Sequence, residues 1–160
     1  MRLSHTLAIA AFSSAATLGA VALVQAGGAA PMRSRVFDSM HVKPELTKAG
    51  ERREVFDAPT ATLERFESHV TTLNPGQALH PPHKHVEEEL MIVREGTVET
   101  TLNGQTTRVE VGGMIFCASN EMHGIRNAGT TRASYYVLKW FPHDLPKTGR
   151  SDGGTMTAKP

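Results

Sequence analysis

The chain has 160 residues, a formal net charge of +1 at pH 7 and a single cysteine, Cys117. This length suits one domain. The sequence contains no basic run or tail, which excludes nucleic-acid binding because that function needs a basic footprint. One cysteine cannot build an internal disulfide framework. Since Cys117 lies in an apolar run, we expect a buried, inert thiol rather than a reactive or metal-binding one.

Residues 1–26 have the pattern of a secretory signal peptide. A positive start at Arg2 precedes an apolar run over residues 6–24, and Val24-Gln25-Ala26 fits the small-residue cleavage pattern. Residues 28–30 fit almost as well, so the mature chain is expected to begin at residue 27 or 31. An uncleaved anchor is the alternative, but polar and small residues interrupt the run. We therefore expect a periplasmic or secreted protein with no stable membrane anchor after cleavage.

The rest of the chain divides into three parts. Residues 27–60 contain two short amphipathic pieces, separated by Pro44 and Gly50, that predict an N-terminal arm or edge strands. Residues 61–142 carry many short β-patterned runs with turn residues between them, which is typical of an all-β sandwich or barrel. Residues 143–160 show no periodicity and are predicted to form a disordered tail.

The clearest local prediction is a β-hairpin over residues 97–111. Asn103-Gly104 is the preferred two-residue hairpin turn. Pairing outward from this turn sets Leu102 opposite Gln105, Thr100 opposite Thr107 and Val98 opposite Val109. Cross-strand pairs of these types are mildly stabilising, by about 0.2–1 kcal/mol each. The chemistry of both faces therefore agrees with this register.

Four residues in two segments form a candidate metal site. His83 and His85 are two residues apart, and in a strand such residues point to the same face. Glu89 follows in the same segment, and His123 lies in the second. Imidazole and carboxylate ligands suit Zn, Fe, Mn, Ni or Cu. An unbroken strand would put Glu87 rather than Glu89 on the face of the two histidines, so the spacing alone leaves the carboxylate open.

This spacing resembles the two sequence motifs of the cupin superfamily. The first segment reads G-x6-H-x-H-x3-E-x6-G over residues 76–96, and the second reads G-x9-H-x3-N over residues 113–127. The resemblance covers roughly residues 62–141 and implies a double-stranded β-helix, or jelly-roll barrel. It also implies that one divalent transition metal is bound by His83, His85, Glu89 and His123. The sequence departs from the family pattern by one additional residue before His83 and by Asn120 near the place of a glycine.

The other histidines are isolated from any ligand pattern. We expect ordinary surface or hydrogen-bonded roles for His5, His41, His69, His80 and His143. His80 is the nearest to the candidate site and could line the mouth of its pocket.

Three functions remain open from the sequence. The first is a small exported metalloenzyme, a dioxygenase, isomerase, lyase or hydrolase, that acts on a small oxygen-rich molecule. The second is a non-catalytic, metal-dependent module that binds or senses a small-molecule ligand. The third is a metal-free carbohydrate binder, against which the intact ligand set argues. The sequence shows no second catalytic motif, so no catalytic residue is assigned.

We also expect a homodimer. Sheet edges need cover, and two-fold pairing is the commonest arrangement of soluble homo-oligomers. The candidate surfaces are the pieces around Val36 and Val55 and the aromatic stripe of Tyr136, Leu138 and Trp140.

Overall fold

The computed structural model describes residues 29–151, and this part of the chain forms nine β-strands. Their bounds are β1 Glu45–Thr47, β2 Gly50–Ala58, β3 Arg65–Leu73, β4 Glu88–Glu95, β5 Thr97–Leu102, β6 Gln105–Glu110, β7 Met114–Cys117, β8 His123–Asn127 and β9 Ala133–Phe141. The predicted signal peptide, residues 1–26, lies outside the described residues. Between residues 29 and 151, no helix has the length and apolar character needed to cross a membrane.

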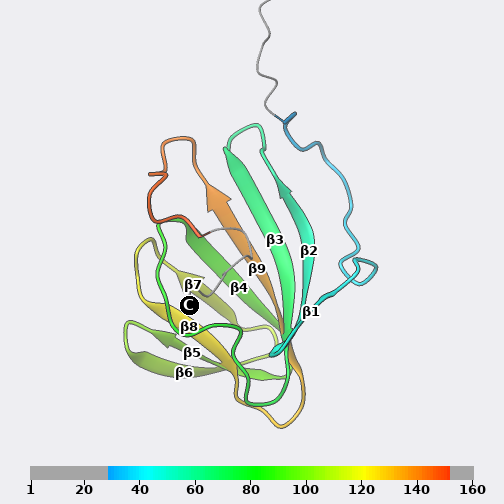
Figure 1. Ribbon diagram of the computed structural model, residues 1–160, viewed down its shortest axis with the longest axis vertical. Coiled ribbons are helices and arrows are strands. Elements are labelled where there is room, and N and C mark those ends of the chain that lie inside the picture. The colour runs from blue at the N-terminus through cyan, green and yellow to red at the C-terminus, as the bar shows by residue number, and fades with distance from the viewer. Residues whose placement is uncertain (1–28, 152–160) are drawn as a thin grey trace, which may run out of the picture.

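The strands form two antiparallel sheets. The larger sheet has six strands in the order β1-β2-β3-β9-β4-β7, and the smaller has three in the order β6-β5-β8. Figure 1 shows the long strands β2, β3 and β9 side by side, with the smaller sheet at the lower left. This arrangement confirms the predicted all-β, double-stranded β-helix, or jelly-roll, fold.

The segment before the barrel combines the two forms that the sequence left open. Residues 45–58 make β1 and β2, which pair with each other and occupy one edge of the larger sheet. Residues 29–44 run outside β2 as an arm (Figure 1). Phe37 on the arm packs against Phe56 on β2, with the ring centroids 4.8 Å apart. Aromatic contact therefore fixes the arm to the outer face of the sheet.

The hairpin of β5 and β6 confirms the predicted register. Its cross-strand partners are Val98 with Val109, Thr100 with Thr107 and Leu102 with Gln105. The two turn residues, Asn103 and Gly104, have φ angles of 48° and 84°, the left-handed values that this turn requires.

The inward faces of the strands are apolar at one end of the barrel and polar at the other. The core takes side chains from both sheets, including Leu73, Met91, Val98, Ile125 and Tyr135. Cys117 is buried, as expected, and burial raises the pKa of its thiol to about 12. Further along the inward faces of β3, β4 and β9, the buried side chains become polar: Glu67, His69, Glu89 and Lys139. These residues place the candidate site at one end of the barrel.

The segment after β9 differs from the predicted disordered tail as far as residue 151. Val86 N donates to Gly149 O at 3.1 Å, and the Arg150 guanidinium binds both carboxylate oxygens of Glu64 at 3.1 Å. Ser151 N donates to Glu87 Oε1 at 2.8 Å. These contacts join distant parts of the chain and leave no periodic signal in the sequence. Residues 152–160 lie outside the described part.

Candidate metal centre

Backbone pairing brings the two motif segments together. His83 and His123 form an isolated antiparallel bridge, with N–H to O distances of 2.9 Å in both directions. Asn120 N donates to His85 O at 2.7 Å. Asn120 itself has φ = 61°, the left-handed conformation that asparagine tolerates better than most residues. The asparagine near the family's glycine place therefore preserves the turn before β8.

The three histidine rings of these segments face one another. Ring centroids lie 4.6–5.3 Å apart among His83, His85 and His123. One nitrogen from each ring lies within 4.8 Å of the others. The sequence-predicted histidines thus converge on one point, with His85 and His123 buried and His83 partly exposed.

Hydrogen bonds fix the tautomers of two rings. His85 Nδ1 lies 2.9 Å from Glu87 O, and His123 Nδ1 lies 2.9 Å from Glu121 O. Because a carbonyl oxygen only accepts, each Nδ1 carries the proton and each Nε2 keeps its lone pair. Among the residues that the structure describes, both Nε2 atoms, and His83 Nδ1, are buried without a hydrogen-bond partner. Since one nitrogen from each ring converges in this cluster, the three imidazoles fit a divalent transition metal.

Glu89 adds a carboxylate to the cluster. Its Oε2 lies 3.7 Å from His85 Nε2, and its Oε1 lies 3.8 Å from His123 Nε2. Lys139 Nζ stands 3.3 Å from Oε2 on the other side. Burial alone would raise the pKa of Glu89, but the contact with His85 and the Lys139 ammonium outweigh it and hold the pKa at about 2. Glu89 is therefore in the anionic form that binds a metal.

His83 and His123 are held in their neutral form. Burial, followed by the neighbouring imidazoles, lowers the pKa of His83 to about 4. Burial also lowers the pKa of His123. A neutral imidazole is the form that ligates metals, so these residues are ready to bind near neutral pH.

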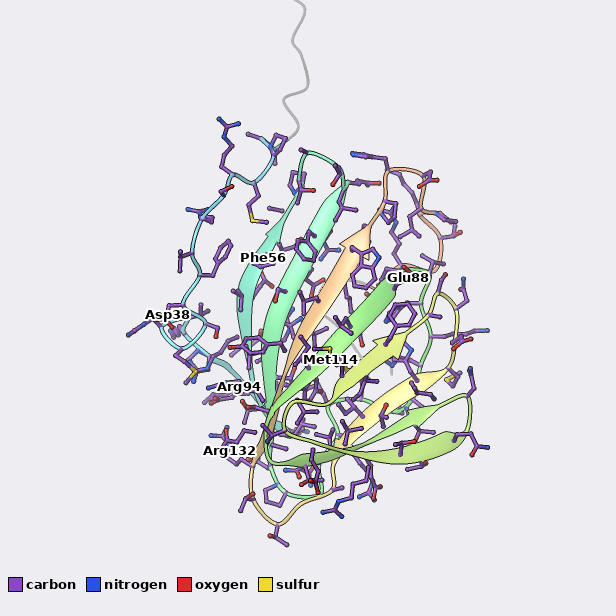
Figure 2. The ribbon with its side chains drawn as sticks, turned by 180° about the vertical axis from the view of Figure 1, so that it is seen from behind. Asp38, Phe56, Glu88, Arg94, Met114 and Arg132 are labelled. Carbon is purple, nitrogen blue, oxygen red and sulfur yellow. The ribbon has the colours of Figure 1, made fainter. Side chains whose placement is uncertain are left out.

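The neighbouring carboxylates point elsewhere. The chain bends after His85, and β4 begins only at Glu88. Glu87 is fully buried on the Nδ1 side of His85, 3.6 Å away, where Ser151 binds it. Glu88 accepts a hydrogen bond from Trp140 Nε1 at 3.0 Å on the outer face of the sheet (Figure 2). Because of this bend, the carboxylate of Glu89, and not that of Glu87, lies at the histidine cluster.

Cys117 forms a second possible group with Glu89 and His123. The ligand atoms of these three residues also lie within 4.8 Å of one another. A metal binds the thiolate, and the raised pKa of this thiol opposes that form. The histidine set fits a metal better.

A cavity of about 240 Å³ opens from the cluster into the barrel. Apolar side chains from Leu79, Met91, Ile125 and Val137 cover part of its wall. The polar lining comes from Glu45, Thr47, Arg52, His69, Thr71, His80, His83, Glu89, Tyr135, Lys139 and Ser151. His80 lies beside His83, with the ring centroids 4.2 Å apart. It lines the cavity, which agrees with the alternative role that the sequence left open for it. His69 is hydrogen-bonded, as expected, but it also lines the cavity, which the sequence did not indicate.

Comparisons with known proteins agree with this structure. Residues 69–139 match the family model Cupin_2, described as a cupin domain, and this range includes all four candidate ligands. The chain is 24% identical over 102 residues to the polyketide synthase CurC of Streptomyces cyaneus, an alignment that covers 64% of this chain and 66% of that protein, just under two thirds.

Two solved structures share the fold of this chain. The polyketide cyclase RemF of Streptomyces resistomycificus aligns with a TM-score of 0.56 and 25% identity, over 72% of this chain and 89% of RemF. KdgF from Halomonas sp. aligns with a TM-score of 0.57 and 17% identity, over 70% of this chain and 98% of KdgF. The family match and the shared fold together support a place for this chain in the cupin superfamily.

Proposed function

We propose that the chain is a metal-dependent enzyme that acts on a small oxygen-rich molecule. One observation carries the proposal: one nitrogen from each of three imidazoles and the Glu89 carboxylate converge beside a cavity of about 240 Å³, whose wall includes His83 and Glu89. Structural zinc sites are usually closed and rich in cysteine. This cluster has a cavity beside it and uses histidine, which favours a site that receives a ligand.

His83, His85, Glu89 and His123 would hold a divalent Mn, Fe, Zn, Ni or Cu ion. When bound, such an ion polarises a carbonyl or enolate oxygen of the ligand. Lys139 keeps Glu89 anionic and adds a positive charge at the cavity wall. Tyr135 stays a neutral phenol, because burial raises its pKa. These groups favour an anionic or easily enolised ligand, while the apolar wall accepts its carbon skeleton.

The named relatives help to choose among the reactions left open. Of dioxygenase, isomerase, lyase and hydrolase chemistry, we favour proton transfer next to a carbonyl group, as an isomerase or lyase performs. The support is the likeness to CurC, a polyketide synthase protein, and to RemF, a polyketide cyclase. The alternative is the metal-dependent module that binds or senses such a molecule without turnover.

A direct comparison of conversion and binding tests the proposal. Metal-loaded protein is incubated with a panel of small 1,3-dicarbonyl compounds and hydroxy acids, and products are followed by mass spectrometry. We expect conversion that is lost in His123→Ala and retained in His143→Gln, because His143 is exposed and remote from the cluster. Binding without conversion across the panel would favour the sensing module.

Export is part of the same proposal. The signal-peptide pattern of residues 1–26 supports a periplasmic or secreted protein, in which the metal is acquired after export. Intact-mass measurement on protein from an exporting host should give a chain that begins at residue 27 or 31. A membrane-bound form that retains Met1 would contradict this localisation.

A further inference from the structure

We propose that Glu67 and His69 on β3 form the proton-transfer pair of the cavity, with His69 Nε2 as the atom that takes up a ligand proton and returns it. This inference rests on the proposed function, since it assigns a role to a second wall of the same cavity. His69 is only 8% exposed and lines the cavity together with His83 and Glu89. Only β9 separates β3 from β4, so these two strands lie about 10 Å apart, a span that a small molecule can bridge.

The contacts of the His69 ring leave one nitrogen for the cavity. Nδ1 lies 3.0 Å from Glu67 Oε1 and 3.2 Å from Arg52 Nη2. Within residues 29–151, both hydrogen-bond contacts of the ring are made by Nδ1. Nε2 is therefore the nitrogen that can meet a ligand.

The two contacts at Nδ1 allow both tautomers of the ring. When Nδ1 carries the proton, it donates to the Glu67 carboxylate and Nε2 presents a lone pair. When Nδ1 is bare, it accepts from Arg52, and Nε2 presents an N–H group. A histidine between a carboxylate and a guanidinium can therefore act as an acceptor or as a donor without moving its ring.

The surrounding charges keep Glu67 ionised. Glu67 is 1% exposed and binds Arg52 at 3.0 Å and Arg65 at 3.1 Å. Burial would raise its pKa, but contacts with His69 and with Lys139 and Arg65 lower it to about 2. A fixed carboxylate behind the imidazole stabilises the imidazolium that forms when Nε2 takes a proton.

The charges around His69 also set its resting form. Burial lowers the pKa of His69, and the cations Arg52 and Lys139 act in the same direction, while Glu67 opposes them. Arg52 comes from β2, Glu67 from β3 itself and Lys139 from β9. His69 is therefore neutral near neutral pH and able to accept a proton.

The step is a simple transfer. A C–H or O–H bond of the ligand breaks, its electron pair stays on the ligand as an enolate or oxyanion, and the proton bonds to His69 Nε2. The same proton returns to the ligand later, so no oxidant or reductant is needed. Lys139 is less suited to this role, because its ammonium already contacts Glu89 and donates to Ser151 Oγ at 3.1 Å.

Acetohydroxamic acid is a suitable probe, since it is neutral near pH 7 and binds metal ions as its anion. Isothermal titration calorimetry in two buffers with different ionisation enthalpies counts the protons released on binding to the zinc-loaded protein. We expect His69→Gln to release about one proton more per bound hydroxamate than the wild type. The exposed variant His143→Gln should match the wild type. Equal release by His69→Gln and the wild type would overturn the inference and leave the proposed function intact.

Imidazole ¹⁵N NMR of the wild type gives a second test that needs no variant. In the hydroxamate complex, His69 should show the signature of an imidazolium, and a neutral His69 would overturn the inference. A zinc-loaded wild type that does not bind hydroxamate at all would instead contradict the proposed function, and this inference with it.

Discussion

The two polar sides of the cavity differ in whether their buried polar groups have hydrogen-bond partners within the protein. On one side, the histidine wall, nitrogens of His83, His85 and His123 are buried with no hydrogen-bond partner among residues 29–151, and His83 lines the cavity. On the other side, the paired wall, the side chains of Arg52, Glu67 and His69 contact one another at 3.0–3.2 Å. The histidine wall therefore has buried nitrogens that a ligand could pair with, whereas the charged groups of the paired wall have partners within the protein and, in the part of the chain that the structure describes, His69 Nε2 stays free for a ligand.

The energies of the two walls explain this difference. A buried polar group without a partner costs about 1–3 kcal/mol, so a ligand that pairs with these nitrogens would be favoured. A bound metal would supply these partners, so we expect the histidine wall to act as a binding surface. In the paired wall, contacts within the protein hold the charged side chains in place without a ligand. Changes on the second wall should therefore act mainly on stability and proton transfer, and changes on the first mainly on metal affinity.

The largest effect is expected from breaking the paired wall. Glu67→Ala removes the buried carboxylate partner of Arg52 and leaves the guanidinium paired with the half-exposed Glu54, and loss of one partner of a buried ion pair costs about 3–5 kcal/mol. Urea denaturation of metal-free protein measures this change. His83→Ala should cost clearly less in the same assay, because it leaves no unpaired buried charge. Equal losses in the two variants would remove the distinction between the walls.

The second-largest effect should come from acid, which should lower the free energy of unfolding through the paired wall. The pKa of Glu67 is lowered from 4.5 to about 2 in the folded protein. A lowered carboxyl pKa stabilises the fold above the unfolded-state value, and this contribution of about 3 kcal/mol is lost as the pH falls from about 4.5 to 2. Denaturation of the metal-free wild type and Glu67→Gln across this range should show a steeper loss in the wild type. Parallel curves would mean that Glu67 is not specially stabilised as an anion.

A smaller effect should distinguish the acidic residues near the histidine wall. Glu89→Gln should lower zinc affinity by about 10–100-fold, whereas Glu87→Gln, which faces Ser151 and the far side of His85, should do less. Competition with a chromophoric chelator measures both affinities. The reverse order would show that the bend after His85 is misassigned.

The smallest structural effect concerns the outer face of the larger sheet. Phe116 and Met114 on the edge strand β7 are 51% and 67% exposed, and the Phe116 ring stacks on Trp140 with centroids 6.3 Å apart. Met114, Glu88 and Phe56 are labelled on this side of the sheet in Figure 2. We predict a homodimer that covers this face, as light scattering at micromolar concentration should show. Phe116→Glu should shift the mass toward the monomer, and a monomeric wild type would reject the dimer.

The sequence predicted features whose signals are local or motif-based. The Asn103-Gly104 turn specified its register, and the spacing of the two motifs grouped four residues that the structure brings together. The paired wall was not predicted, because Arg52, Glu67 and His69 lie on two strands and each is unremarkable alone. Their relation depends on the inward alternation of both strands and on the register that pairs Arg52 with Thr71, two residues from His69.

Zinc-edge X-ray absorption on the wild type and on His83→Ala tests the central claim, that the unpartnered histidines and Glu89 bind a metal. The wild type should show scattering from three imidazoles at about 2.0–2.1 Å, together with a carboxylate oxygen. His83→Ala should lose one imidazole from that shell, or lose the metal. An imidazole count that is the same in both proteins, or a wild type that binds no zinc, would contradict the account.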